Sequence, residues 1–265
     1  MYSAFQLTKK YLLYYFKADN GKGHGVHSPF VFDFIIHVLN DKTKHPEYKK
    51  IEKLRTQVLN NSTIIEVEDF GAGSAVFASK SRAIKNIARS SLKSKKYAQL
   101  LFRIAKYYNR KKIVELGTSL GITTCYLASA SDASNVYSFE GSKNIASVAR
   151  RNFVSAGLKN IEITEGDFEL TVPQAFEKIS NPDLIFIDGN HRKQPTLNYF
   201  HAFLQKSNSE TIFIFDDIHW SSEMEDAWIE IKQHPSVTLT VDLFFIGLVF
   251  LKTEFKIKQD FAVRF

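Results

Sequence analysis

The second half of the chain alternates short apolar runs with amphipathic segments, and no other feature constrains the fold as strongly. Five runs have the length and character of buried strands, at residues 113–116, 136–139, 161–164, 184–187 and 212–215. Amphipathic, helical patterns lie between them. Apolar strands that alternate with helices are typical of a parallel sheet covered by helices on both faces. We therefore expect an α/β fold in this part of the chain.

The last part of the chain departs from this rhythm. After a helical pattern at residues 223–233, two strand patterns at 237–245 and 248–251 follow each other, with Gly247 between them. Two strands joined by a short turn form an antiparallel hairpin. We therefore expect a Rossmann-like, seven-stranded sheet that is mostly parallel and ends in an antiparallel hairpin.

Charge divides the chain into a basic first part and an acidic remainder. Residues 1–112 contain 22 Lys and Arg against 8 Asp and Glu, whereas residues 113–265 contain 13 against 20. The basic part is mainly helical in pattern, beginning with an amphipathic segment at residues 3–17. We expect a helical, basic N-terminal extension at residues 1–95 and an α/β domain at residues 96–265.

Cysteine usage and hydropathy bear on the cellular compartment. A single cysteine, Cys125, excludes an intrachain disulfide and a cysteine-ligated zinc cluster, as is typical of a reducing compartment. The longest apolar run, residues 243–251, is less than half of a membrane span, and the N-terminal segment lacks a signal-peptide pattern. We expect no transmembrane segment and a cytoplasmic location.

The first motif with chemical content joins the first strand of the alternating region to the helix after it. Residues 115–121 read ELGTSLG, so an acidic residue and two glycines lie where the strand ends. Glycines there allow a tight turn and a close backbone approach to a ligand, and ligands bind at the carboxyl ends of parallel strands. The candidate binding residues in this turn are Glu115, Gly117, Thr118, Ser119 and Gly121.

The next two strands also end in acidic residues. Glu140, followed by Gly141, lies 19 residues after Gly121, where a carboxylate can hold both hydroxyls of a ribose. The third strand leads into Asp167, which can accept from an adenine amino group, and Phe168, which can stack on the ring. Three acids at successive strand ends suit an adenosine ligand that carries a cationic group instead of phosphates.

These motifs resemble those of the class I S-adenosylmethionine-dependent methyltransferases, over residues 97–255 and including the terminal hairpin. The resemblance implies that S-adenosylmethionine is the cofactor. It also implies that Glu115 and Gly117 lie near its methionine part, Glu140 on the ribose and Asp167 at the adenine. Residues 96–265 would then be the cofactor-binding domain, and residues 1–95 a lid that forms part of the acceptor site.

A second set of residues follows the fourth and fifth strands. Asp188 and His191 come after one strand, and Asp216 and Asp217 after the other. Neighbouring strands lie about 4.8 Å apart, so carboxylates at their ends can converge on one cation. Mg²⁺ prefers oxygen ligands in an octahedral array. We therefore treat Asp188, Asp216 and Asp217 as candidate metal ligands, with carboxylates that only contact ligand as the alternative.

This set resembles that of metal-dependent O-methyltransferases, of the catechol and caffeoyl-CoA types and of the sugar types that act on macrolides and aminocoumarins. In the catechol type a lysine three residues after the first aspartate acts as base, and His191 stands at the matching position. The resemblance implies O-methylation of a small-molecule hydroxyl, assisted by Mg²⁺. His191 and Asp188 are the catalytic candidates, and Asp188 is also a cofactor contact.

Other interpretations stay open at this point. The basic first part suits an anionic acceptor, whereas a metal held by three carboxylates would suit a diol. The same positive charge suits a nucleic-acid methyltransferase, and the amphipathic segment at residues 3–17 leaves a membrane surface as a further alternative. A non-catalytic protein that binds S-adenosylmethionine is a further alternative, and a homodimer is left open. The tract at residues 69–74, DFGAGS, imitates the first glycine motif, and we interpret it as a turn or a substrate-facing loop.

Overall fold

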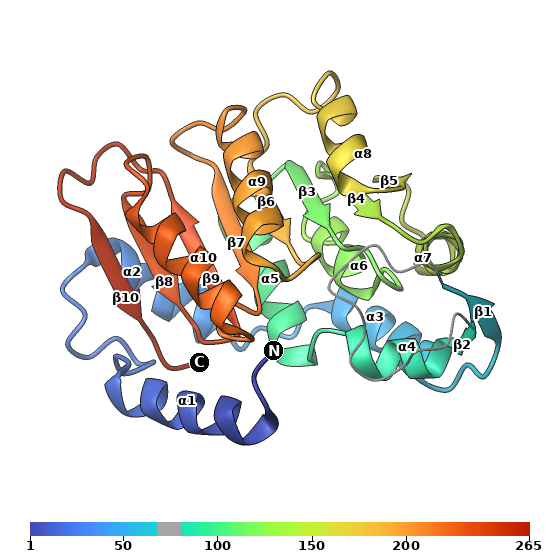
Figure 1. Ribbon diagram of the computed structural model, residues 1–265, viewed down its shortest axis with the longest axis horizontal. Coiled ribbons are helices and arrows are strands. Elements are labelled where there is room, and N and C mark those ends of the chain that lie inside the picture. The colour runs from blue at the N-terminus through green and yellow to red at the C-terminus, as the bar shows by residue number, and fades with distance from the viewer. Residues whose placement is uncertain (68–80) are drawn as a thin grey trace. The chain divides into compact units, whose positions relative to one another are not determined.

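The computed structural model describes residues 1–67 and 81–265 (Figure 1). The chain forms two compact units, one of residues 42–180 and one of residues 1–41 together with 181–265. The tract at residues 69–74 lies outside the described residues. Neither unit begins or ends at residue 95, where the sequence predicts a boundary. That division, and the lid role of residues 1–95, stay predictions.

The unit of residues 42–180 contains three parallel strands in the order β3–β4–β5. The strands are β3 (Lys112–Leu116), β4 (Asn135–Glu140) and β5 (Ile161–Glu165), and each is followed by a helix, α6 (Ile122–Ala128), α7 (Lys143–Ala156) and α8 (Phe168–Ala175). In the pairing register, Glu115 lies beside Ser138. The carboxyl ends of all three strands therefore lie at one edge, as the sequence predicts.

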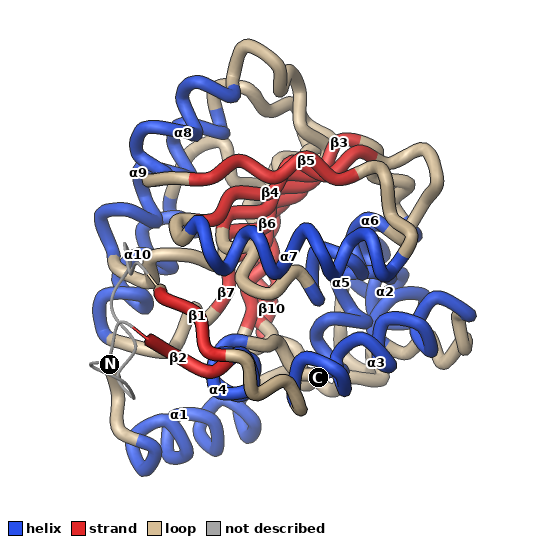
Figure 2. Tube along the Cα trace, turned by 90° about the vertical axis from the view of Figure 1, so that its right-hand side faces the viewer, coloured by secondary structure: helices blue, strands red, loops and turns tan. Residues whose placement is uncertain are grey.

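The remaining elements of this unit form a helical layer and a hairpin. They are α3 (Pro46–Leu59), β1 (Ile64–Glu66), β2 (Ser81–Ala83), α4 (Ile84–Ser91) and α5 (Lys95–Tyr107). A proline in the first turn of α3 suits the helix start, and its buried stripe of Ile51, Leu54 and Val58 has helical spacing. α3 contacts α6 and α7, which run beside each other (Figure 2), and α5 contacts α6.

The other unit contains five strands in the order β10–β8–β9–β7–β6. Its strands are β6 (Leu184–Ile187), β7 (Ile212–Asp216), β8 (Leu239–Asp242), β9 (Ile246–Phe250) and β10 (Gln259–Ala262). β6 and β7 are parallel, whereas β9 runs antiparallel to both β7 and β8. The mostly parallel arrangement and the antiparallel hairpin are thus confirmed, and β10, parallel to β8, is a strand that we did not predict.

The turn that the sequence pattern predicts at Gly247 is wrong. The chain turns instead at residues 243–245, where Phe244 adopts a left-handed φ of 68° and its backbone N–H donates to Asp242 Oδ1 at 2.7 Å. Gly247 lies inside β9, where an added Cβ would come within 2.6 Å of the Trp228 ring. The glycine is therefore required for close packing and not for a turn.

Four helices complete this unit, α1 (Ala4–Lys17), α2 (Pro29–Phe34), α9 (Lys193–Leu204) and α10 (Ser222–Gln233), with the short π-helix η1 (Ile35–Leu39). A capping box of Ser3 and Gln6 starts α1. The Asp19 N–H donates to the Ala262 carbonyl at 2.7 Å, so the segment after α1 extends the edge at β10. Within the described residues, no helix is both long enough and apolar enough to cross a membrane.

Candidate active site

The loop between β3 and α6 has the conformation that the ELGTSLG motif predicts. Gly117 and Gly121 adopt positive φ angles of 103° and 78°. The Gly117 and Thr118 N–H groups donate to the Phe139 carbonyl at 3.0 and 3.1 Å, which ties the loop to the end of β4. A Cβ at Gly121 would lie 2.4 Å from the Phe153 ring. Both the backbone angle and the space therefore require glycine at position 121.

Glu115 lies beneath this loop with its side chain completely buried. Its Oε2 accepts from the hydroxyls of Thr124 at 2.5 Å and Ser138 at 2.6 Å. Burial raises the pKa of Glu115 to about 7, against the opposing effect of these two hydrogen bonds and with the charge of Glu140 contributing further. Its Oε1 has no hydrogen-bond partner among the described residues. Glu115 thus holds β3, β4 and α6 together from inside.

Glu140 is half-buried at the end of β4 and connects two loops. Its Oε2 accepts from the Ser119 N–H at 2.8 Å, and its Oε1 accepts from the Ser142 N–H at 3.0 Å. Ser119 itself has a left-handed φ of 49°. The adjacent Gly141 is also half-buried. These two hydrogen bonds hold the carboxylate in place at the strand edge.

Asp167 and Phe168 lie where β5 ends and α8 begins. Asp167 is the N-cap of α8, and its Oδ1 accepts from the Glu169 N–H at 2.9 Å. The Gly166 N–H donates to the Glu140 carbonyl at 2.9 Å, and Phe168 is half-buried. The candidate cofactor residues on β3, β4 and β5 thus gather at one edge. They are Glu115, Gly117, Thr118, Ser119, Gly121, Glu140, Gly141, Asp167 and Phe168.

The second set of residues lies in the other unit, at the carboxyl ends of β6 and β7. Asp188, His191 and Asp216 each place one ligand atom within 4.8 Å of the others. His191 Nε2 lies 3.7 Å from Asp188 Oδ1, and Asp216 is only 2% exposed. Because β6 and β7 are adjacent parallel strands, their ends bring these groups together as the sequence predicts. The His191 imidazole is thus a further candidate metal ligand, whereas the sequence predicts it only as a base.

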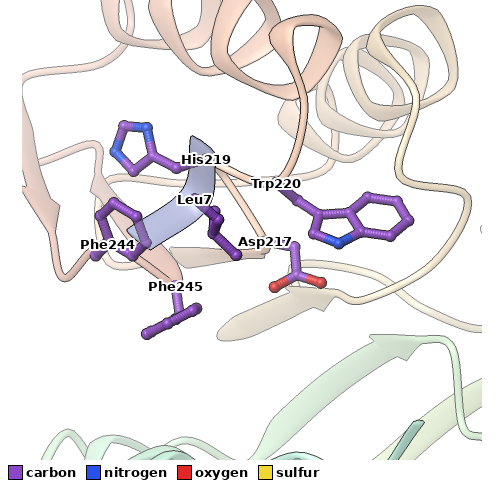
Figure 3. Close-up of a pocket in the computed structure, with 6 residues that line it drawn as sticks. All are labelled: Leu7, Asp217, His219, Trp220, Phe244 and Phe245. Carbon is purple, nitrogen blue, oxygen red and sulfur yellow. The ribbon is translucent and has the colours of Figure 1, made fainter. Parts of the chain in front are cut away.

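Asp217 is not a member of this group. It adopts a left-handed φ of 52°, and its N–H donates to the Phe245 carbonyl at 2.6 Å. Figure 3 shows Asp217 and Trp220 across Leu7 from the two phenylalanines of the hairpin turn. These side chains, with His219, line a small pocket. The ring of Trp220 also meets that of His191 edge to face, with centroids 5.5 Å apart.

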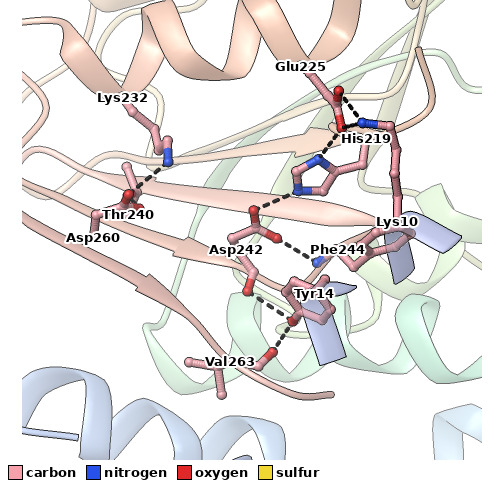
Figure 4. Close-up of polar contacts among 10 residues, drawn as sticks. All are labelled: Lys10, Tyr14, His219, Glu225, Lys232, Thr240, Asp242, Phe244, Asp260 and Val263. Carbon is pink, nitrogen blue, oxygen red and sulfur yellow. Dashed lines mark hydrogen bonds and ion pairs between the residues drawn. The ribbon is translucent and has the colours of Figure 1, made fainter. Parts of the chain in front are cut away.

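His219 has a role that the sequence did not reveal (Figure 4). Its Nε2 lies 2.8 Å from Asp242 Oδ2 and its Nδ1 lies 3.1 Å from Glu225 Oε1. Glu225 also accepts from Lys10 Nζ at 2.8 Å and from the Tyr2 hydroxyl at 2.7 Å. The network therefore ties α1 and the segment before it to α10 and the end of β8.

The pKa of His219 follows from these contacts. Burial alone would lower it, but the hydrogen bonds and charges of Asp242 and Glu225 outweigh burial and raise the pKa above its ordinary value. Burial by contrast raises the pKa of Glu225, but the contacts with Lys10, Tyr2 and His219 outweigh burial and lower this pKa below its ordinary value. Both shifts favour the charged forms, the protonated imidazole of His219 and the carboxylate of Glu225.

A family model described as a methyltransferase domain matches residues 114–218. Residues 114–218 are therefore similar to a methyltransferase domain. A catechol O-methyltransferase of Niastella koreensis is 32% identical to the chain over 126 residues, which are 46% of this chain and 55% of that protein. The match thus spans about half of that relative's length.

Solved structures share the fold of most of the chain. An O-methyltransferase from Bacillus cereus in complex with SAH has a TM-score of 0.56 at 21% identity, over 79% of this chain and 92% of that one. A putative O-methyltransferase from Klebsiella pneumoniae has a TM-score of 0.56 at 18% identity, over 80% and 92%. The Rossmann-like fold of the methyltransferases is therefore confirmed.

Proposed function

We propose that the chain is an S-adenosylmethionine-dependent methyltransferase that methylates a hydroxyl group of a small molecule. The observation that carries the proposal is the strand edge of the methyltransferase domain, where a glycine loop and the strand-end acids Glu140 and Asp167 lie together. The catechol O-methyltransferase relative and the SAH-bound solved structure support the same cofactor and the same type of acceptor atom.

The cofactor would be held by groups of different character. Gly117 and Gly121 allow the backbone to approach the methionine part closely, and Glu140 would accept from the ribose hydroxyls. Asp167 would accept from the adenine amino group, with Phe168 against the ring. The buried, easily protonated Glu115 would keep the loop in shape without direct exposure to solvent.

The reaction would be an in-line displacement at the methyl carbon. As the acceptor oxygen forms its bond to that carbon, the carbon–sulfur bond breaks and sulfur keeps the electron pair. The acceptor hydroxyl must lose its proton, and His191 is the base that we propose, oriented by Asp188 at 3.7 Å. Alignment of the two reacting atoms would supply much of the rate.

The group at the ends of β6 and β7 fits a divalent cation. Asp188 and Asp216 offer carboxylate oxygens that suit Mg²⁺, and their ligand atoms lie within 4.8 Å of each other and of His191. A bound cation would act as a Lewis acid on the acceptor hydroxyl and favour a diol that binds through two oxygens. Participation of Asp217 in cation binding stays a prediction.

The test measures ligand affinity by calorimetry for the parent and a variant, each with two ligands. Glu140→Ala should weaken binding of S-adenosylhomocysteine by about 1–3 kcal/mol, because hydrogen bonds to a charged group are lost. It should have much less effect on a 2′,3′-dideoxy analogue, which cannot make those bonds. Glu162→Ala, an exposed carboxylate at the other end of β5, is the matched control.

Two outcomes would contradict the proposal. Absence of S-adenosylhomocysteine binding in the parent protein would remove the cofactor assignment. Equal effects of Glu140→Ala on both ligands would remove the ribose assignment. A nucleic-acid methyltransferase would be distinguished by an affinity for RNA or DNA that falls steeply as the salt concentration rises. A non-catalytic binding protein would bind the cofactor but show no methyl-transfer turnover on any hydroxyl acceptor.

A further inference from the structure

The outward face of α1 exposes large apolar side chains to solvent. Five of the fifteen large hydrophobic residues that are exposed in the described part of the chain belong to this one helix. They are Phe5, Leu12, Leu13, Tyr15 and Phe16, and Phe5 and Phe16 are 80% and 77% exposed. Soluble surfaces usually carry such side chains singly, whereas a group of them marks an interaction site.

The geometry of α1 keeps this face turned outward. Phe5, Leu12 and Phe16 are separated by seven and four residues, so they lie along one side of the helix. The opposite side is held by Lys10, which donates to Glu225, and by Tyr14, whose hydroxyl donates to the Asp242 and Val263 carbonyls. A rotation of α1 that buried the apolar face would break these contacts.

The charges around this face are positive. Between Ala4 and Lys17 the sequence has no Asp or Glu, and Lys9 and Lys17 are exposed. Arg264 adds a further cation, with its guanidinium carbon 4.7 Å from the centre of the Tyr15 ring. Exposed aromatic and aliphatic side chains beside lysines, on a helix of 14 residues, are the pattern of helices that lie in a membrane interface.

We propose that the outward face of α1 docks the protein on the surface of an anionic lipid bilayer. The helix would lie parallel to the bilayer, with Phe5, Leu12 and Phe16 at the boundary between headgroups and acyl chains. Lys9 and Lys17 would face the anionic headgroups. The helix is about 21 Å long at 1.5 Å per residue, and it carries charges, so it lies on the membrane and does not span it.

The experiment is co-sedimentation of the full chain with lipid vesicles. We expect binding to phosphatidylcholine vesicles that contain phosphatidylglycerol, weaker binding to pure phosphatidylcholine, and a decrease with salt. Phe5→Ser with Phe16→Ser should lower the partition coefficient by at least about 100-fold. Lys9→Gln with Lys17→Gln should lower it by about 25-fold, since each cation near such a surface contributes about fivefold.

Matched controls come from another helix, α7, and the loop that follows it. Val154→Ser removes a side chain that is 79% exposed on α7, and Lys159→Gln removes an exposed cation. Both should leave the partition coefficient unchanged. Because all substituted side chains are exposed, thermal melting of each variant should match the parent, which shows that a lost affinity is not a folding defect.

Three results would overturn the proposal. One is no sedimentation with anionic vesicles at low salt. Another is sedimentation that the Phe5→Ser, Phe16→Ser variant retains in full. The third is vesicle-independent self-association, seen by light scattering, that this variant abolishes, because the face would then cover a second copy of the chain and not lipid.

Discussion

Glu115 offers a quantitative test of the buried site, through the dependence of stability on pH. The folded protein raises its pKa from the ordinary 4.5 to about 7, chiefly by burial. The folded state therefore holds the proton more tightly than the unfolded chain does. The contribution of Glu115 to stability is therefore fully present below pH 4.5 and is lost as the pH rises from 4.5 to 7. Linkage over this window predicts a loss of roughly 2–3 kcal/mol between pH 5 and pH 8 from this one group.

The perturbation is Glu115→Gln, which removes the ionisation and keeps the shape. The amide changes the contacts with Thr124 and Ser138, so the variant has a cost of its own, but that cost does not depend on pH. The difference in free energy of unfolding between variant and parent should therefore move in favour of the variant by roughly 2–3 kcal/mol from pH 5 to pH 8.

The assay is urea denaturation of both proteins at several pH values, without ligand. Comparing the difference between the two proteins cancels every other titrating group that they share. A difference that stays within about 0.5 kcal/mol across the range would refute the reasoning, since the carboxylate would then titrate as it does in the unfolded chain.

Three further predictions concern other parts of the molecule. Gly121→Ala should lower the free energy of unfolding by about 2–5 kcal/mol and weaken cofactor binding, whereas Gly25→Ala, with a similar φ of 86° and no described atom within 4 Å of the new Cβ, should cost about 1–2 kcal/mol. Equal losses in chemical denaturation would contradict the role of the Phe153 contact. The parent should lose stability as the pH rises through the raised pKa of His219, so His219→Gln should be less stable by about 2 kcal/mol at pH 6 and by less at pH 9; a deficit that is constant with pH would argue against the charged histidine. Asp216→Asn should weaken Mg²⁺ binding in calorimetry, whereas His191→Ala should slow methyl transfer by about 10²–10⁴-fold and leave Mg²⁺ affinity intact if His191 is the base; loss of Mg²⁺ affinity in His191→Ala would make it a ligand instead.

The repeating pattern of strands and helices was readable in the sequence because burial imposes a period on apolar residues. Strands that are buried on both faces are apolar throughout, and the helices between them are amphipathic, so the elements of the α/β fold are visible without tertiary information. The same logic located the acids Glu140 and Asp167, since parallel strands bring their carboxyl ends to one edge. It also brought Asp188 and Asp216 together, on the neighbouring strands β6 and β7.

Tertiary structure decided what depends on contacts between distant segments. No local pattern distinguishes a glycine in a turn from one that makes room for an indole ring, so only the packing of Trp228 showed why Gly247 lies within β9. The two partners of His219 lie on α10 and β8, and a sequence carries no record of which carboxylates will face a histidine. The exposure of Phe5 and Phe16 likewise emerged only once the other side of α1 was seen to be held by Lys10 and Tyr14. An amphipathic pattern shows that a helix has an apolar side, and only the folded chain shows whether that side is buried.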